Sequence, residues 1–302
     1  MRLVNCNFCG SSSANLLYVL RDLQLGLPGE FTLVKCENCG LLFLNPQPTW
    51  EELQPYYPEW YDPFLRKYLS LIQRYGILRQ CRVVSKYQQG GRLLDVGCST
   101  GIFLNEMRRS GRWEVYGVEP AAFPARIARE RFGLRVFQQT LLEAKLPENY
   151  FDVVTWWDVL EHTPDPKECL QETYRILKPG GWVFIKTPDP NSWGAKLFGP
   201  WWRDFDAPRH LHLFPVPTLT NQLGLLGFRV RSVKNFAGNL STAFRSLGYW
   251  LDSQGLKVIG SFAHILARSV LCRVVTFPIA FLLRHTGHTF SVLYIAQKGP
   301  YG

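Results

Sequence analysis

Short apolar runs alternate with longer stretches of mixed polarity through the middle of the chain. The apolar runs predict strands at 92–96, 113–118, 134–137, 151–156 and 182–187. The stretches between them predict helices at 102–109, 121–132 and 166–177, and the sequence Lys178-Pro179-Gly180-Gly181 should stop the last helix before the next strand. Strands that alternate with helices predict a parallel sheet covered by helices, which is an α/β fold.

A different pattern begins after residue 187. Residues 188–214 predict a long irregular loop, and long loops at the carboxyl edge of a parallel sheet concentrate substrate contacts. A helix at 218–226 and strands at 228–233 and 289–298 follow. About fifty residues, 237–288, separate these two strands and form a predicted helical insertion.

The insertion contains polar residues at helical spacing. They share one predicted face: Lys257, Ser261, His264 and Arg268. Apolar residues define the other face: Ile259, Phe262, Ile265, Leu266, Val270 and Leu271. This pattern predicts an amphipathic helix, which is followed by a nearly apolar run at 274–283.

The insertion is too interrupted to cross a membrane, because a span needs about 20 apolar residues and Arg268, Arg273 and Arg284 divide the region into shorter runs. It has five Lys/Arg residues against one acid, Asp252. We therefore interpret residues 255–285 as a helix pair that lies on a membrane surface. An extra helical cap or a dimer interface is the alternative, and the oligomeric state stays open.

The amino-terminal segment contains two CxxC pairs, separated by 26 residues and each followed by glycine. Together they supply four thiols: Cys6, Cys9, Cys36 and Cys39. Four cysteines at this spacing can complete a tetrahedral zinc shell with no open position, which favours a structural Zn²⁺ site. The segment 1–46 is predicted to be a zinc ribbon with strands at 16–20 and 31–34, and four unmetallated thiols are the alternative. Residues 47–90 are rich in aromatic residues and then helical, as expected of a linker or lid.

The composition is that of an ordinary globular protein, with 46% hydrophobic and 19% charged residues. The net charge of +10 favours an anionic partner, either nucleic acid or a phospholipid surface, although a generally basic enzyme explains it equally well. The amino terminus has no apolar core of signal-peptide length. We expect a cytoplasmic protein with reduced cysteines, and peripheral contact with the inner face of the membrane is an option.

The strand at 92–96 leads into a glycine turn, and acidic residues end this strand and the next one. Asp95 precedes Gly97 and Gly101, and Glu119 follows the second strand, 24 residues after Asp95. The dinucleotide pattern G-x-G-x-x-G is absent, because Ser99 and Ile102 occupy its other glycine positions. The glycines are expected to let the backbone approach a ligand closely, and a carboxylate at the end of strand two can hold ribose hydroxyls.

The pattern Asp95-x-Gly97-x-x-x-Gly101 with Glu119 resembles the S-adenosylmethionine site of class I methyltransferases. The run from Leu93 to Thr187 resembles their core, including the L-K-P-G-G turn, and the cysteine-rich amino end is similar to that of some bacterial members. The resemblance implies a Rossmann-like, seven-stranded sheet in residues 91–302, with 289–298 as its antiparallel last strand. It also implies S-adenosylmethionine as cofactor, with Leu141 beside the adenine and Asp158 near the methionine part.

Methyl transfer from a sulfonium is an in-line displacement, and a hydroxyl acceptor needs a base. The candidate bases are His210, His162 and Glu161, with His210 preferred because its loop should lie over the cofactor. His212 lies two residues further on and is expected to point the other way. Glu161 and His162 could instead cap their loop or help to bind a metal.

Three functions are consistent with these residues. The leading one is methylation of a small molecule, at a hydroxyl of a sugar, glycan or lipid-linked precursor. The second is RNA methylation with the ribbon as a grip, but enzymes that methylate exocyclic base amines usually carry [DN]-P-P-[FY] where this chain has Asp158-Val159-Leu160-Glu161. The ribbon also lacks a cluster of basic and aromatic residues, so nucleic acid is disfavoured. The third is a non-catalytic scaffold, against which the intact cofactor pattern argues.

Overall fold

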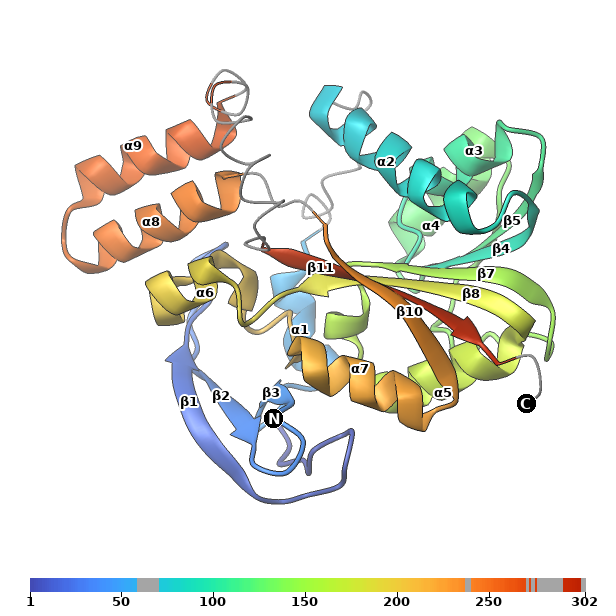
Figure 1. Cartoon of the computed structure of the whole chain (residues 1–302). Helices are drawn as coiled ribbons and strands as arrows, with labels where there is room; N and C mark the ends of the chain where they lie inside the picture. The colour runs from blue at the N-terminus through green and yellow to red at the C-terminus, as the bar shows by residue number, and fades with distance from the viewer. Residues whose placement is uncertain (59–70, 237–239, 270–271, 273–274, 276–289, 300–302) are drawn as a thin grey trace.

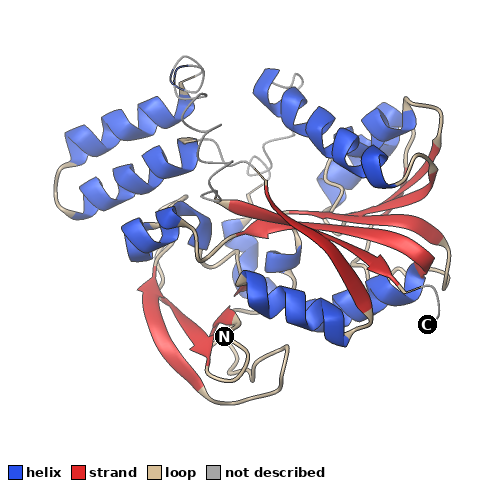
Figure 2. Cartoon of the chain, viewed as in Figure 1, coloured by secondary structure: helices blue, strands red, loops and turns tan. Residues whose placement is uncertain are grey.

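A computed structural model describes the chain apart from residues 59–70, 237–239, 270–271, 273–274, 276–289 and 300–302. Its centre is a seven-stranded sheet in the order β10-β11-β8-β7-β4-β5-β6 (Figures 1 and 2). Five strands are parallel: β4 (Gly91–Val96), β5 (Trp113–Val118), β6 (Arg135–Phe137), β7 (Phe151–Trp157) and β8 (Leu177–Pro188). The last strand, β11 (Ser291–Lys298), is antiparallel between β8 and β10 (Phe228–Asn235). The predicted α/β sheet with an antiparallel seventh strand is therefore confirmed.

Helices cover both faces of this sheet because successive strand residues point to opposite sides. Three helices cover one face: α2 (Leu71–Tyr87), α3 (Ile102–Arg108) and α4 (Ala122–Phe132). Two cover the other: α5 (Pro166–Ile176) and α7 (Val216–Leu225). Leu93 packs with the first group and Leu94 with the second, and both are fully buried.

One predicted boundary is wrong. Residues 178–181 were expected to form a turn before a strand at 182–187, but β8 already begins at Leu177. Phe151 pairs with Leu177 while Val153 pairs with Trp182, so the ladder absorbs the extra residues as a bulge. Gly180 makes this possible, because its φ of +79° is one that a glycine adopts without strain.

A second, smaller sheet contains the amino-terminal segment. Its order is β1 (Ala14–Leu20), β2 (Phe31–Cys36), β3 (Leu42–Leu44) and β9 (His212–Leu213). The fourth strand comes from the long loop after β8, and it pairs Leu42 with Leu213 and Phe43 with His212. The segment therefore completes its sheet with a strand of the methyltransferase-like part.

Short helices connect these parts. Between β3 and α2 lie α1 (Trp50–Leu53), begun by a capping box of Thr49 and Glu52, and the 3₁₀ helix η1 (Gln54–Tyr56). The 3₁₀ helix η3 (Leu160–His162) follows β7. The loop after β8 contains α6 (Trp193–Phe198), η4 (Gly199–Trp201) and η5 (Arg203–Phe205).

The insertion forms a helical hairpin of α8 (Ser241–Ser253) and α9 (Lys257–Arg268), which projects from the body in Figure 1. The expectation of an amphipathic helix is confirmed in α9, whose polar face lies partly against α8. His264 belongs to the predicted polar face, yet its Nε2 contacts Asp252 Oδ2 of α8 at 3.1 Å. Small residues make the rest of this contact: Gly260, Ala263 and Ala267 are buried.

The large apolar residues of α9 point away from α8. Four of them are exposed: Val258 (86%), Ile259 (54%), Phe262 (60%) and Ile265 (63%). The expectations for Val270, Leu271 and 274–283 fall largely outside the described residues. Among the residues that are described, no helix is both long and apolar enough to cross a membrane.

Candidate functional site

The turn after β4 depends on left-handed backbone conformations. Gly97, Ser99 and Gly101 have φ values of +69°, +48° and +75°. A Cβ atom at Gly97 would lie 2.5 Å from Cγ2 of Val159, and one at Gly101 would lie 2.4 Å from Cδ1 of Leu134. The left-handed φ values and the neighbouring side chains therefore explain why glycine occupies both positions. The sequence pattern suggested a different reason, which was the close approach of a ligand.

Asp95 and Glu119 lie on the same edge of the sheet, as the sequence predicts. Asp95 pairs in register with Gly117 on the neighbouring strand, and Glu119 follows that strand directly. Thr155 Oγ1 donates to Asp95 Oδ1 at 2.6 Å, while Glu119 accepts from the backbone N–H groups of Ser99 and Ala121, each at 2.9 Å. Glu119 therefore fixes the glycine turn itself.

The two carboxylates also influence each other. The pKa of Asp95 is raised to about 8, chiefly by burial; the hydrogen bond from Thr155 opposes this rise, and the charge of Glu119 contributes to it. A cationic ligand that binds beside this carboxyl group would lower its pKa and favour its ionised form. The part that Asp95, Gly97, Gly101 and Glu119 play in cofactor binding stays a prediction.

Leu141 and Asp158 lie in different surroundings. Leu141 is buried (3% exposed) and packs in the core that contains Leu94. Asp158 is exposed, has a φ of +57° and forms an ion pair with Lys186. Because Val159 touches the position of a Cβ at Gly97, the 158–162 segment is next to the glycine turn.

The three candidate bases meet beside this turn. One ligand atom each of Glu161, His162 and His210 lies within 4.8 Å of the others. The two imidazole rings contact edge to face with their centroids 4.6 Å apart. Residues far apart in sequence therefore form one cluster, which we call the base cluster.

Hydrogen bonds orient both histidines of the base cluster. Nδ1 of His162 lies 3.0 Å from the carbonyl oxygen of Arg209, and Nδ1 of His210 lies 2.8 Å from that of Asp204. A carbonyl can only accept, so we assign the ring proton of His210 to Nδ1, which leaves the lone pair on Nε2. Nδ1 of His162 also lies 3.0 Å from the hydroxyl of Tyr57, which can donate or accept. Burial lowers the pKa of His162 and lowers that of His210 to about 3, so both rings are neutral at pH 7.

Glu161 is fully buried, and neither of its carboxylate oxygens has a hydrogen-bond partner among the described residues. Burial, reinforced by Asp158, raises the pKa of Glu161 well above its usual range. An unpaired buried carboxyl is costly, and a proton or a cation relieves that cost. The Nε2 atoms of His162 and His210 and the carboxylate of Glu161 also form a donor set that suits a transition-metal cation. The other nitrogen of each imidazole lies against a backbone carbonyl oxygen, which orients the ring.

His212 does not join the base cluster. It is buried in β9, where its Nε2 lies 3.1 Å from Nε2 of Gln47 and its Nδ1 lies 3.1 Å from the carbonyl oxygen of Thr163. Its side chain therefore contacts Gln47, directly after the amino-terminal segment, and points away from the base cluster. In a fully extended chain residues 210 and 212 would share a face, so the backbone is not regularly extended between them.

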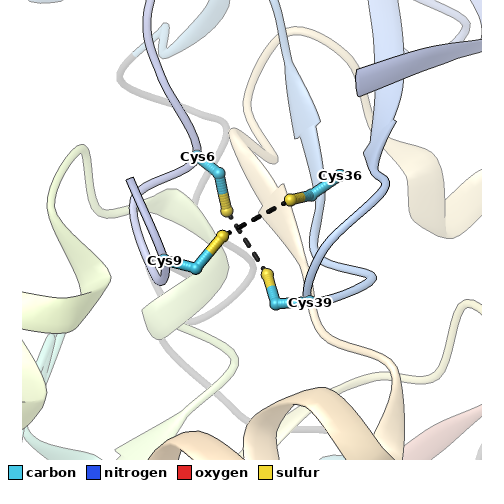
Figure 3. Close-up of side chains that lie close together, drawn as sticks. All are labelled: Cys6, Cys9, Cys36 and Cys39. Atoms are coloured by element: carbon cyan, nitrogen blue, oxygen red, sulfur yellow. Dashed lines mark hydrogen bonds between the residues drawn. The ribbon is translucent and has the colours of Figure 1, made fainter. Parts of the chain in front are cut away.

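The four amino-terminal cysteines converge, as Figure 3 shows. Sγ of Cys6 lies 3.4 Å from Sγ of Cys39, and Sγ of Cys9 lies 3.5 Å from Sγ of Cys36. A tetrahedral zinc ion with Zn–S bonds of about 2.3 Å separates its sulfurs by roughly 3.8 Å. The thiols therefore fit a zinc ion after a small outward adjustment, and the complete sulfur shell favours a structural role.

One buried ion cluster has no signal in the sequence. Arg209 is fully buried, and its Nη2 lies 2.7 Å from Oδ1 of Asp22 and 2.7 Å from Oδ1 of Asp206. Arg209 precedes the candidate base His210, whereas Asp22 lies between β1 and β2 of the amino-terminal segment. The cluster thus joins that segment to the loop after β8.

A recess of about 380 Å³ opens at the same junction. Tyr18 and Lys35 line it from the amino-terminal segment, and Asn191, Lys196 and Phe205 line it from the loop after β8. Its walls do not include Asp95 or Glu119.

The sheet order, the glycine turn and the paired acidic residues define a class I methyltransferase fold. The sequence profile of the family described as "Methyltransferase domain" matches residues 64–233, which is more than half of the chain. The chain therefore belongs to the class I S-adenosylmethionine-dependent methyltransferase family.

Similar proteins support this assignment. The ubiquinone biosynthesis O-methyltransferase of Klebsiella pneumoniae is 41% identical over 109 residues, which are 34% of this chain and 44% of that protein. The enzyme of the same name from Paracidovorax citrulli is 38% identical over 118 residues, 36% of this chain and 48% of that protein. The chain thus spans about half the length of these curated relatives.

Solved structures show the same fold. A SAM-dependent methyltransferase from Archaeoglobus fulgidus superposes with a TM-score of 0.51 at 24% identity, covering 75% of this chain and 94% of that one. A methyltransferase from Thermotoga maritima superposes with a TM-score of 0.51 at 19% identity, covering 82% and 97%.

Replacing Asp95 with Asn should weaken cofactor binding, because the variant removes the carboxyl group that would ionise beside a cationic ligand and retains the shape of the side chain. We expect S-adenosylhomocysteine to bind about ten- to a hundredfold more weakly in calorimetry. Asp152→Asn is the matched control, since Asp152 lies in the same sheet but accepts from the backbone N–H of Arg92 at the opposite edge. Equal affinity in Asp95→Asn and the unmodified protein would contradict the cofactor site.

The purified protein should contain one zinc ion per chain, measured by plasma mass spectrometry. Cys9→Ser should lose this metal and unfold at a lower temperature, because the sulfur shell would be incomplete. Cys81→Ser, which alters a thiol of α2 outside the cluster, should keep the metal. Zinc content that is unchanged in Cys9→Ser would show that the four thiols do not hold it.

Proposed function

We propose that this chain transfers the methyl group of S-adenosylmethionine to a hydroxyl of a small molecule, such as a sugar, a glycan or a lipid-linked precursor. The base cluster carries this proposal, because a hydroxyl must lose its proton as the methyl group arrives and three groups able to take a proton meet beside the glycine turn. The curated relatives named O-methyltransferases support the same acceptor atom.

The residues divide the reaction between two sides of the site. Asp95, Glu119 and the glycine turn bind and orient the cofactor, whose sulfonium supplies the methyl group. On the acceptor side, Glu161 in its ionised form is the stronger candidate base because burial raises its pKa, and the Nε2 lone pair of His210, whose pKa is lowered to about 3, is the weaker one. The backbone carbonyl oxygens of Arg209 and Asp204 orient the two imidazoles. Burial of the base cluster keeps water away from the transferred group.

A cation held by Glu161, His162 and His210 is a second way to reach the same product. The unpaired oxygens of Glu161 favour it, because a bound cation would satisfy them. When bound, such an ion lowers the pKa of an acceptor hydroxyl. The protein's own contribution is the fixed orientation of the two imidazoles.

The RNA alternative has less support from the described residues. In the amino-terminal segment Arg21 is paired with Glu30 and Lys35 lines the recess, so these cations do not form a continuous basic track with stacked aromatic residues. The scaffold alternative conflicts with the intact turn and its buried acidic residues.

Glu161→Gln should lower turnover by about a hundredfold or more, because the variant cannot take a proton and binds a cation poorly. We would incubate a bacterial lysate, which contains small molecules, lipid-linked precursors and RNA, with methyl-labelled S-adenosylmethionine and identify the labelled atom by mass spectrometry. Label on oxygen is expected, with cofactor affinity unchanged. Glu172→Gln, which alters a surface ion pair of α5, serves as the control.

Two outcomes of this experiment would contradict the proposal. Label that becomes soluble after ribonuclease treatment would favour the RNA alternative, and label on nitrogen or carbon would exclude a hydroxyl acceptor. If chelators abolish transfer and added divalent metal restores it, the cation route is favoured over the simple base.

We also propose that the exposed face of α9 contacts an anionic membrane surface, where a lipid-linked acceptor would reside. Large apolar side chains on this face lie between Lys257 and Arg268 at the two ends of the helix. Apolar residues flanked by basic ones favour binding in the plane of an anionic lipid surface.

Phe262→Ser combined with Ile265→Ser should weaken sedimentation with phosphatidylglycerol vesicles by at least about tenfold, because both side chains would lose their burial in lipid. Leu225→Ser is the matched control, since Leu225 is a 74% exposed apolar residue of α7 and lies outside the hairpin. Equal sedimentation of the double variant would remove the membrane role. A change in sedimentation-velocity mass without vesicles would favour the dimer interface instead.

A further inference from the structure

The loop that carries His210 is held largely by the amino-terminal segment. Leu44 N donates to the carbonyl oxygen of Leu211 at 3.0 Å, and β9 continues this pairing beside β3. Gln24 Oε1 accepts from Arg203 at 2.9 Å, at the other end of the same loop. Residues 203–213, which we call the base loop, are therefore hydrogen-bonded to the amino-terminal segment near both ends.

The strongest of these links is the buried ion cluster. Arg209 and Asp22 have no exposed side-chain surface, and Asp206 has 2%. Asp22 also accepts from three backbone N–H groups of its own turn, those of Gln24, Leu25 and Leu27, each at 3.2 Å. Its carboxylate is thus fixed before it meets the guanidinium, and it presents a rigid acceptor to the base loop.

The same arginine reaches the base cluster through its backbone. The carbonyl oxygen of Arg209 accepts from Nδ1 of His162, and the next residue is His210. Leu211 N donates to the carbonyl oxygen of Glu161 at 2.8 Å. A displacement of Arg209 would therefore move every member of the base cluster.

We propose that the cysteine-bearing segment 1–46 positions the base loop for catalysis, and that Asp22 is the positioning residue through which it acts. The segment then serves the reaction without touching either substrate. The inference rests on the proposed function only for the catalytic role of the base cluster, because the mechanical link itself is independent of the acceptor.

Amide hydrogen exchange of the full chain tests this link without a known acceptor. Asp22→Asn keeps an acceptor oxygen and removes the charge, so it should raise exchange of the base loop about ten- to a hundredfold. Exchange in residues 91–101 and the calorimetric affinity for S-adenosylhomocysteine should stay unchanged. Glu30→Gln is the matched control, since it breaks the exposed ion pair of the same β1–β2 connection.

Gln24→Ala provides a second, milder variant, because it removes one contact with Arg203 and leaves the buried ion cluster intact. A smaller rise confined to the base loop is expected.

The proposal is overturned if Asp22→Asn raises exchange only in residues 21–30, which would limit Asp22 to shaping its own turn. A uniform rise that includes 91–101 would also overturn it, since that result indicates general destabilisation. Failure of label transfer to oxygen, by contrast, would refute the acceptor and leave this link standing.

Discussion

A buried guanidinium between two carboxylates holds together the two parts of this protein. Charges taken out of water carry a large desolvation cost, and breaking such a pair by removing one partner costs about 3–5 kcal/mol. Arg209, Asp22 and Asp206 must therefore stay assembled once the fold has closed around them. Because Asp22 and Arg209 come from different parts of the chain, the ion cluster imposes one arrangement of the cysteine-bearing segment on the loop beside the site.

The two sides of the site are built in different ways. The proposed cofactor side is local: β4, its glycine turn, α3 and β5 follow one another, and Glu119 accepts from Ser99 in that turn. The proposed acceptor side is assembled from η3 and from the base loop, whose residues are far apart in sequence. A contiguous strand-turn-helix-strand unit is set by local backbone geometry, whereas the base cluster depends on tertiary contacts.

This difference explains how much could be predicted from the sequence. Hydrophobic alternation and the D-x-G-x-x-x-G pattern were enough for the sheet, because each strand carries its own signal. The same approach misjudged residues 178–181, where a bulge with a positive-φ glycine extends β8. It could not find Asp22, because a lone aspartate before a turn looks like an ordinary surface residue. In α9 the pattern identified the helix but not which residues pack, since His264 of the polar face and the small residue Gly260 both lie against Asp252 of α8.

The amino-terminal segment is short for a domain that is stable alone, and this constraint couples it to the base loop. Its three strands gain a fourth from the base loop, and its buried leucines share a core with Trp202, Phe205 and Leu213. Below about 70 residues a metal or a partner surface usually supplies the missing stability. Here the sulfur cluster secures one end of the small sheet and the base loop secures the other. By thermodynamic linkage, whatever orders the base loop also stabilises the cysteine-bearing segment, so an acceptor bound at the site and a metal bound by the cysteines favour the same folded arrangement.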